Sequence, residues 1–206
     1  MFTWPEEISF KSSRLVSHLQ KKIRALELKL FKASLTRFLK SAGTVADIAS
    51  GNGILLPLLQ ERQLTVYAVN SSLSPEEQKK WIKPGNSLIT FQTMDPKKLL
   101  FPDHAFDYVT SRGLFELLNE NDRKRVLSEL IRITRNLLFI AVRTTDFSLT
   151  SAISSLAAPE LLPPSLMSTK ELRAMISNAA NLQLLELRTA GGLDRGFVIA
   201  VLQKKN

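Results

Sequence analysis

Apolar residues recur at steps of three and four near the start of the chain, and in short alternating blocks further along. Five of them share one stripe of a helix: Val16, Leu19, Ile23, Leu26 and Leu30. No Gly or Pro interrupts residues 12–40, so the pattern predicts helix there, with Gly43 as the residue that closes it. The pattern also accommodates a break near residues 32–35, which would give two helices.

Beyond residue 43, β-prone runs alternate with helical patterns. Strands are predicted at residues 44–49, 64–69, 88–92, 106–110, 137–142, 182–187 and 197–202. Helices are predicted at residues 54–62, from Ser74 to about Pro84, at 122–135 and at 168–179. This alternation predicts an α/β fold, with a mostly parallel sheet covered by helices on both faces. The last two strands, joined at Gly191-Gly192, predict an antiparallel pair.

Composition fits one globular domain without cysteine chemistry. The chain has 206 residues, of which 44% are hydrophobic and 23% are charged. The absence of cysteine excludes disulfides, thiolate metal sites and a cysteine nucleophile, and it is compatible with a reducing cytoplasm. The apolar runs are too short to span a bilayer, and no secretory signal is recognised. We therefore expect a cytoplasmic protein that holds no metal.

The net charge of +9 is concentrated near the N-terminus. Residues 11–40 contain nine Lys or Arg and one acid, Glu27, which gives +8 in this segment. Three interpretations follow. The helix could cover the sheet with a solvated outer face, bind RNA or another polyanion electrostatically, or lie on an anionic membrane surface.

A glycine-containing loop follows the first predicted strand. Asp47 is followed by Ile-Ala-Ser and then by Gly51-Asn-Gly53, and such glycines let the backbone pass close to a ligand. A nicotinamide-binding loop would need a third glycine where Leu56 stands, and the Lys-Ser/Thr ending of a phosphate-binding loop is also missing. A bound ligand and a plain strand-to-helix turn both remain open for this loop alone.

A second motif follows the third predicted strand. Residues 93–109 read TMDPKKLLFPDHAFDYV: an acidic residue, then a Leu-x-Phe-Pro-Asp turn that leads through Phe-Asp into strand four. With residues 47–53, in this order, the two motifs resemble those of the class I methyltransferases. The resemblance covers roughly residues 40–203 and is nearest to small-molecule enzymes such as those of quinone biosynthesis.

The resemblance implies a Rossmann-like, seven-stranded sheet that binds S-adenosylmethionine. Asp47, Gly51 and Gly53 would line the methionine portion of the cofactor. Asp95 would accept a hydrogen bond from the adenine amino group, and Met94 would pack on the ring. Residues 44–206 would form this domain, with residues 1–43 as a basic helical extension that packs on it.

Three further positions would complete the cofactor site. Arg112, just past strand four, is placed to meet the cofactor carboxylate, although a solvated surface arginine is the alternative. Ala49 stands where the family usually has its first glycine, and a positive φ there would be strained. Asn70 replaces the usual acidic residue after strand two, and an amide lacks the charge-assisted bond to the ribose hydroxyls.

The candidates for acceptor chemistry are few. No Asn/Asp-Pro-Pro-aromatic motif follows strand four, which argues against amino methylation of nucleic acids. His18 and His104 are both expected at the surface. Glu116 is the candidate general base, although a helix-start carboxylate favoured by the helix dipole is an equally good interpretation.

The sequence thus favours methyl transfer from S-adenosylmethionine to an unidentified acceptor, most simply a small molecule. Residues 144–167 and the N-terminal helix would shape the acceptor pocket. The alternative is an inactive relative that serves as a binding or assembly module, contacting RNA or an anionic surface. A nicotinamide-dependent oxidoreductase is a weaker third hypothesis, because the third glycine is missing.

Overall fold

The computed structural model describes residues 6–71, 88–146, 166–179, 181–189 and 196–205, with backbone alone at 6–17, 19, 20 and 23. Its strands are β1 (Thr44–Ile48), β2 (Thr65–Asn70), β3 (Ile89–Thr93), β4 (Phe106–Arg112), β5 (Thr134–Arg143), β6 (Leu182–Thr189) and β7 (Phe197–Lys204). They form one sheet in the order β3-β2-β1-β4-β5-β7-β6. The strand β7 is antiparallel to β5 and β6, while the remaining pairs are parallel. The predicted fold class is confirmed.

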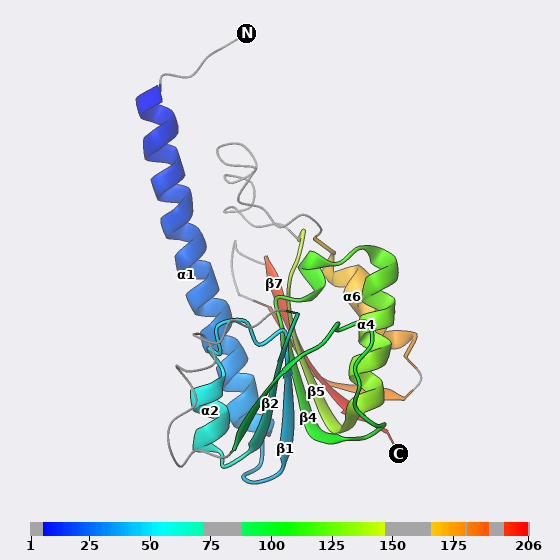
Figure 1. The fold of residues 1–206 in the computed structure, drawn as a ribbon. Coiled ribbons are helices and arrows are strands. Elements are labelled where there is room, and N and C mark those ends of the chain that lie inside the picture. The colour runs from blue at the N-terminus through cyan, green and yellow to red at the C-terminus, as the bar shows by residue number, and fades with distance from the viewer. Residues whose placement is uncertain (1–5, 72–87, 147–165, 180, 190–195, 206) are drawn as a thin grey trace.

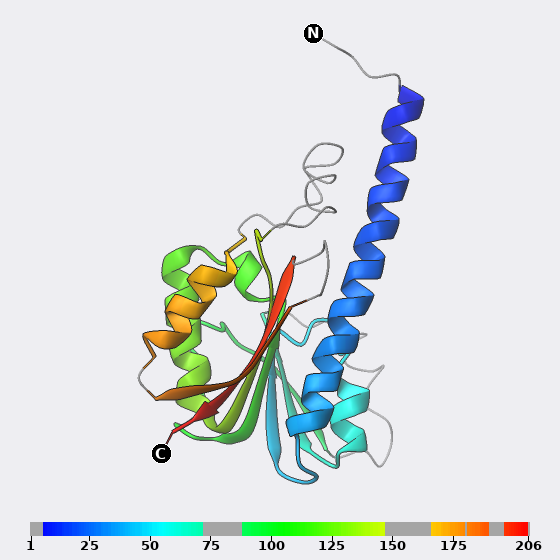
Figure 2. The same ribbon diagram turned by 180° about the vertical axis from the view of Figure 1, so that it is seen from behind.

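Helices cover both faces of this sheet. The described helices are α1 (Glu6–Phe38), α2 (Leu56–Glu61), the short 3-10 helix η1 (Phe115–Leu117), α4 (Glu120–Ile133) and α6 (Thr169–Ser177). Figures 1 and 2 show α1 and α2 on one face and α4 and α6 on the other. Polar caps begin two of them, since the Asn119 side chain accepts from the Asp122 amide and Ser168 forms a capping box with Glu171.

Two apolar clusters fill the space between these layers. On the α4 and α6 face, Leu130 and Ile133 pack with Leu138 and Ile140 of β5. On the α1 and α2 face, Phe139, also of β5, packs in a second cluster that includes Phe31 and Leu35 of α1, Leu59 of α2 and Ile199 of β7. Neighbouring residues of a strand point to opposite faces, and helices cover both faces of this sheet. A central strand such as β5 is therefore buried on both sides, and its sequence is a continuous apolar run.

The helix α1 is longer and straighter than the sequence pattern indicated. It is unbroken from Glu6 to Phe38, so the break near residues 32–35 is wrong. The physical reason is that Phe31, Ser34 and Leu35 form one buried stripe on the sheet, whereas Leu26 of the expected stripe is 41% exposed. Figures 1 and 2 show the N-terminal turns of α1 rising beyond the strands.

The expectation that Gly43 closes α1 is wrong, because the helix ends five residues earlier, at Phe38. It has a φ of +119° and leads into β1, where a Cβ would come within 3.0 Å of Asp107 Oδ2. That carboxylate accepts hydrogen bonds from the Thr44 amide and hydroxyl and pairs with Arg135. Burial alone would raise the pKa of Asp107, but these partners outweigh it and lower the pKa. Gly43 therefore leaves room for the contact that joins β1 to β4.

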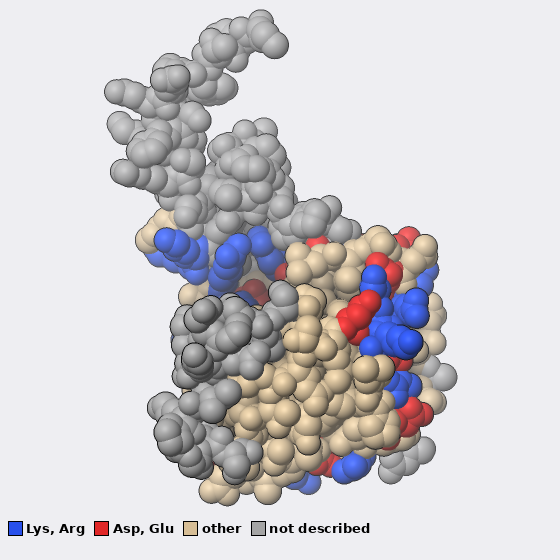
Figure 3. All heavy atoms as spheres, viewed as in Figure 1, with Lys and Arg blue, Asp and Glu red and all other residues tan. Residues whose placement is uncertain are grey.

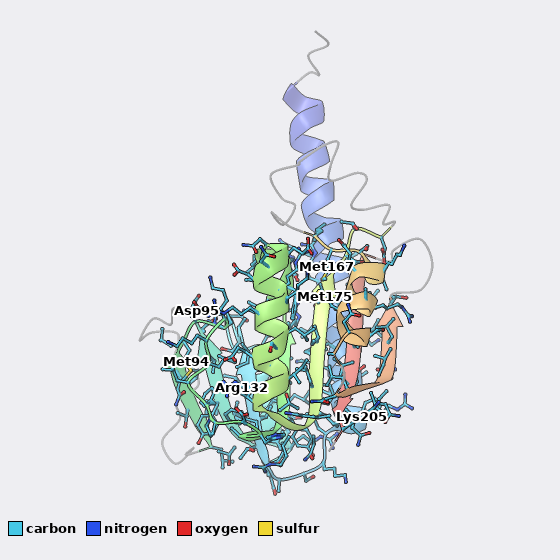
Figure 4. The ribbon with its side chains drawn as sticks, turned by 90° about the vertical axis from the view of Figure 1, so that its right-hand side faces the viewer. Met94, Asp95, Arg132, Met167, Met175 and Lys205 are labelled. Carbon is cyan, nitrogen blue, oxygen red and sulfur yellow. The ribbon has the colours of Figure 1, made fainter. Side chains whose placement is uncertain are left out.

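The Leu-x-Phe-Pro-Asp turn is held by α4. Arg132 donates to the carbonyl oxygens of Leu99 and Phe101, at 2.8 and 2.7 Å, and pairs with Asp103. The Phe101 ring packs edge-on against Phe106 of β4. Figure 4 shows Arg132 on the lower part of α4, away from the carboxyl ends of the strands. This part of the motif therefore supports the fold and not the ligand site.

Several predicted boundaries move by a few residues. Asn70 is the last residue of β2 and Arg112 the last of β4, so both end a strand and do not follow one. The predicted helix from Ser74, the turn at Gly191-Gly192 and most of the connection at 144–167 lie outside the described residues.

Within the described part of the chain, no helix is both long and apolar enough to cross a membrane.

Candidate functional site

A cavity of about 320 Å³ lies beyond the carboxyl ends of β1, β2 and β4. Its lining includes the loop after β1 (residues 49–52) and, on the strand ends, Asp47, Asn70, Arg112 and Gly113, with apolar side chains of Ile54, Leu55 and Leu117. Parallel strands bring their carboxyl ends to one edge, so residues far apart in the sequence meet there. The structure therefore brings together Asp47, Ala49, Gly51, Asn70 and Arg112, five of the eight expected cofactor residues.

Asp47 is a buried carboxylate with one oxygen lacking a protein partner. Its side chain is 2% exposed, and Oδ1 accepts a 2.7 Å hydrogen bond from the Thr110 hydroxyl. Oδ2 has no hydrogen-bond partner among the described residues. Burial raises the pKa of Asp47 to about 6, although the Thr110 bond and the charge of Arg112 act in the opposite direction. A positively charged donor from a ligand would satisfy Oδ2 and stabilise the carboxylate.

The loop after β1 is built from left-handed residues. Ala49, Gly51 and Gly53 have φ values of 62°, 55° and 72°. The expected strain at Ala49 is present, since an alanine occupies a conformation that glycine adopts more readily. The Ser50 amide donates to the Val69 carbonyl, and the Gly53 amide to the Ser50 carbonyl, which fixes the loop against β2. Gly53 is buried and does not itself line the cavity.

Asn70 ties β2 to this loop. Its side-chain Nδ2 donates to the Gly51 carbonyl oxygen at 3.3 Å. An aspartate has no N–H and could not make this bond. The amide that replaces the usual acidic residue thus has a local role in this structure, and its Oδ1 still offers one acceptor to a ligand.

Met94 and Asp95 lie further out, at the end of β3. The Met94 amide donates to the Asn70 carbonyl, and Asp95 Oδ1 accepts from the Lys97 amide at 2.9 Å. Figure 4 shows both residues beside the outermost strands of this side of the sheet. Neither lines the cavity, and Asp95 is exposed. Because β3 lies beside β2 in the sheet, both residues follow Asn70 along the row of strand ends, on the side away from Arg112.

Arg112 closes the opposite wall of the cavity and is paired with α1. Its Nε lies 2.9 Å from Oε1 of Glu27, whose side chain is only 6% exposed. The contact is an ion pair in which the Nε hydrogen is not aligned for a hydrogen bond. Arg112 is therefore not the solvated surface arginine that was the alternative. Glu27, the partner of this lining arginine, was not among the expected residues, although a lone acid among nine cations, four residues before Phe31, is a signal.

Glu116 of η1 lies directly behind Gly113. It is 6% exposed, and Oε2 lies 3.5 Å from the Arg143 amide. Burial raises the pKa of Glu116 to about 7; hydrogen bonds to backbone amides oppose this, and the nearby Glu27 carboxylate adds to it. A Cβ on Gly113 would be 3.7 Å from Oε1, so this carboxyl lies next to a residue that lines the cavity without lining it itself.

The two histidines and a second hollow lie outside this cavity. His18 and His104 are exposed, as expected. A second hollow of about 350 Å³ lies between α4 and α6, and Lys124 is the one charged side chain among the described residues that line it. Among the described residues no cluster of His, Asp or Glu side chains is arranged to hold a metal ion.

Comparison with known proteins agrees with the motifs. Residues 46–139 match a family model described as a methyltransferase domain. No curated protein matches the chain by sequence. Solved structures match it extensively in fold, at low sequence identity.

Three of these structures illustrate the likeness. The 1,6-didemethyltoxoflavin-N1-methyltransferase of Burkholderia thailandensis, solved with S-adenosylhomocysteine, has 16% identity and a TM-score of 0.69 over 100% of this chain and 92% of its own. The magnesium protoporphyrin IX methyltransferase of Synechocystis, also solved with S-adenosylhomocysteine, has 17% identity and a TM-score of 0.72, covering 95% and 94%. A putative methyltransferase of Haloferax volcanii, in complex with the Trm112 activator, has 18% identity and a TM-score of 0.67, covering 85% and 88%.

Proposed function

We propose that this chain, which has the fold of the class I methyltransferases and a methyltransferase-domain match over residues 46–139, transfers a methyl group from S-adenosylmethionine to a small molecule. Two of the structures that share its fold hold S-adenosylhomocysteine, the product of such a transfer. The acceptor is unidentified. The observation that carries the proposal is the pair of opposite charges in the cavity.

Asp47 and Arg112 suit the amino-acid end of this cofactor. The cofactor's methionine portion carries an ammonium and a carboxylate, and the cavity offers a buried carboxylate oxygen without a partner and an arginine on the other wall. Charge-assisted hydrogen bonds of both signs would then fix one end of the ligand. The left-handed loop of Ala49, Gly51 and Gly53 lets the backbone approach it closely.

The remaining candidates would hold the nucleoside end. Asn70 Oδ1 would accept one ribose hydroxyl, Met94 would pack on the adenine and Asp95 would accept from its amino group. These three roles stay predictions from the family resemblance. Their order along the strand ends, from Asn70 to Asp95, suits an extended ligand that begins at Arg112.

The transfer itself needs little covalent help from the protein. The acceptor atom would attack the methyl carbon in line with the sulfur as the carbon–sulfur bond breaks and S-adenosylhomocysteine leaves. Alignment of the two reactants can supply roughly 7–11 kcal/mol of the barrier. An acceptor that carries a proton must lose it, and Glu116, with its pKa raised to about 7, is our candidate base. The part of α1 that rises above the cavity and residues 144–167 would shape the acceptor pocket.

Calorimetry and product analysis test the proposal. S-adenosylhomocysteine should bind the full chain, and Gly51→Val, which adds a branched side chain at a φ of +55°, should abolish binding while the protein stays folded. Methyl-labelled S-adenosylmethionine with a panel of small acceptors should then give a labelled product. Absence of binding by the folded chain would favour the alternative of an inactive binding or assembly module.

For partners and location we propose only a general class of each. A small-molecule acceptor is the partner we propose, because methyltransferases that act on small molecules share this fold. The cytoplasm is the location expected from the lack of cysteine. Contact with RNA or an anionic surface through residues 11–40 is the second partner that we propose to test. Figure 3 shows blue side chains gathered where α1 passes the top of the sheet, and Lys21, Lys22, Arg24 and Lys29 of α1 are all exposed.

A further inference from the structure

The helix α1 lies outside the segment that matches the methyltransferase-domain model, yet it reaches the proposed cofactor cavity. Glu27 is 5% exposed in the middle of the helix, on the stripe that continues with Phe31, Ser34 and Leu35. Its carboxylate meets Arg112, the arginine of the cavity wall, at 2.9 Å. Two elements separated by some eighty residues therefore join at the wall of the cavity.

A buried acid at this position is a costly way to attach a helix. Burial raises the pKa of Glu27, and the charges of Arg112, Arg143 and Arg24 only partly oppose this effect. An apolar residue would continue the packing that Phe31 and Leu35 already make with the sheet. The carboxylate is therefore better explained by what it does to Arg112 than by the attachment of α1.

We propose that Glu27 is a positioning residue of the cofactor site, which holds the Arg112 guanidinium at the cavity wall so that its terminal nitrogens face the cofactor carboxylate. This inference rests on the proposed function. An arginine has five N–H donors in a planar fork, so a counter-ion at Nε leaves the terminal nitrogens able to bind a second carboxylate. Without Glu27, the partly exposed Arg112 side chain would turn towards solvent. The N-terminal helix would then be a working part of the site and more than a cover.

The chain offers a matched control, because a second acid also links α1 to the sheet. Glu186 of β6 has a side chain that is 10% exposed and accepts hydrogen bonds from Ser34 and Arg37 of α1. It also pairs with Arg188 of its own strand. Neither Glu186 nor any of these three partners lines the cavity. Loss of either acid loosens α1, but only the loss of Glu27 releases Arg112.

Two ligands separate a positioning role from a structural one. S-adenosylhomocysteine carries the amino-acid carboxylate, whereas 5′-methylthioadenosine has the same nucleoside and thioether without it. We expect Glu27→Leu to weaken S-adenosylhomocysteine binding by about tenfold, as for the loss of one well-placed ionic contact. Binding of 5′-methylthioadenosine should stay unchanged. Glu27→Gln, which keeps the side-chain shape, should act in the same direction with a smaller effect.

The experiment is calorimetry of both ligands with the full-length wild type, Glu27→Leu, Glu27→Gln, Glu186→Leu, Arg112→Gln and the Glu27→Leu/Arg112→Gln double variant. Support requires a selective loss with both Glu27 variants, none with Glu186→Leu, and a double variant no weaker than Arg112→Gln alone. Unchanged or tighter S-adenosylhomocysteine binding by both Glu27 variants would overturn the inference while leaving the proposed function standing. A wild type that binds neither ligand would overturn the proposed function, and this inference with it.

Discussion

Ala49 occupies a backbone conformation that costs an alanine about 1–2 kcal/mol, with a φ of 62° beside the cavity. Ala49→Gly relieves this strain but makes the unfolded chain more flexible, so we expect a net gain in unfolding free energy of about 0.5–1 kcal/mol. Urea denaturation measures it. Ala68→Gly in β2, a buried position of extended backbone, is the control and should destabilise. A loss of stability in Ala49→Gly would show that the methyl group's packing outweighs the strain.

Asn70 has two roles that a single substitution changes in opposite directions. Asn70→Asp would gain a charge-assisted bond to the ribose, stronger by about 1 kcal/mol or roughly fivefold in affinity. It would lose the bond to the Gly51 carbonyl and place a carboxylate next to that oxygen. We therefore expect a net change in S-adenosylhomocysteine affinity below fivefold, whereas Asn70→Ala, which loses both contacts, should bind more weakly. Equal affinities for wild type and Asn70→Ala would exclude a role for this residue.

Glu116 should make both stability and activity depend on pH near neutrality. Its pKa is raised from 4.5 to about 7, so the folded protein keeps a proton that the unfolded chain has lost. Unfolding then releases a proton between these values, and the contribution to stability falls as pH rises from about 4.5 to 7, by up to about 3 kcal/mol. Asp47, with a pKa of about 6, contributes with the same sign.

Glu116→Gln should therefore be more stable than the wild type at pH 8 and lose part of the decline between pH 4.5 and 7. Denaturation at a series of pH values measures this, with Glu61→Gln at the exposed end of α2 as the control. If Glu116 is the base, the wild-type rate should rise with an apparent pKa near 7 and Glu116→Gln should lose that rise. Parallel pH profiles for the three proteins would contradict the expected burial effect.

The helix α1 belongs to two environments along its length. Its last turns are buried on the sheet, while Lys21, Lys22, Arg24 and Lys29 are exposed. If these cations bind RNA or anionic vesicles, the affinity should fall by orders of magnitude between low and moderate salt, because each phosphate contact releases counter-ions. Lys21→Glu/Lys22→Glu should remove that binding, and Lys124→Glu/Arg125→Glu on α4 should not. Salt-independent binding, or none to either probe, would leave α1 as a cover for the sheet.

Local patterns predicted the elements well, and long-range contacts account for what was missed. The order of strands and helices follows from alternating runs of apolar residues, and the loop after β1 was found because its two glycines are only two positions apart in the sequence. The Glu27–Arg112 pair joins residues far apart in the chain, so a local pattern could mark Glu27 as a lone acid but could not reveal its partner. The unbroken course of α1 past residues 32–35 depends likewise on the sheet beneath it. The periodicity also ended the fourth strand at residue 110, two residues before the observed end of β4 at Arg112.

The N-terminal helix and the sheet share one core, which bears on how the molecule unfolds. Sequence analysis placed a boundary between residues 1–43 and 44–206, and that division stays a prediction. In the structure, Phe31 and Leu35 of α1 lie in the same apolar cluster as Val45 of β1, Leu56 of α2 and Phe139 of β5. A helix that packs into the same apolar cluster as several strands and α2 should not detach from it while the sheet stays folded.

We therefore expect one cooperative transition for the described core. Phe31→Ala deletes a fully buried ring and should lower the unfolding free energy by about 3–5 kcal/mol, shifting the loss of both helical and sheet signals together. Leu26→Ala, at a 41% exposed position of the same helix, is the matched control and should change stability by less than about 1 kcal/mol. Far-ultraviolet circular dichroism and hydrogen exchange of β1 and β7 amides, followed against urea, measure the two signals. If helical signal is lost in Phe31→Ala while the β1 amides keep their protection, α1 unfolds separately from the sheet. The expectation of one cooperative transition would then be wrong, and the proposed role of α1 in the cofactor site could not depend on a shared core.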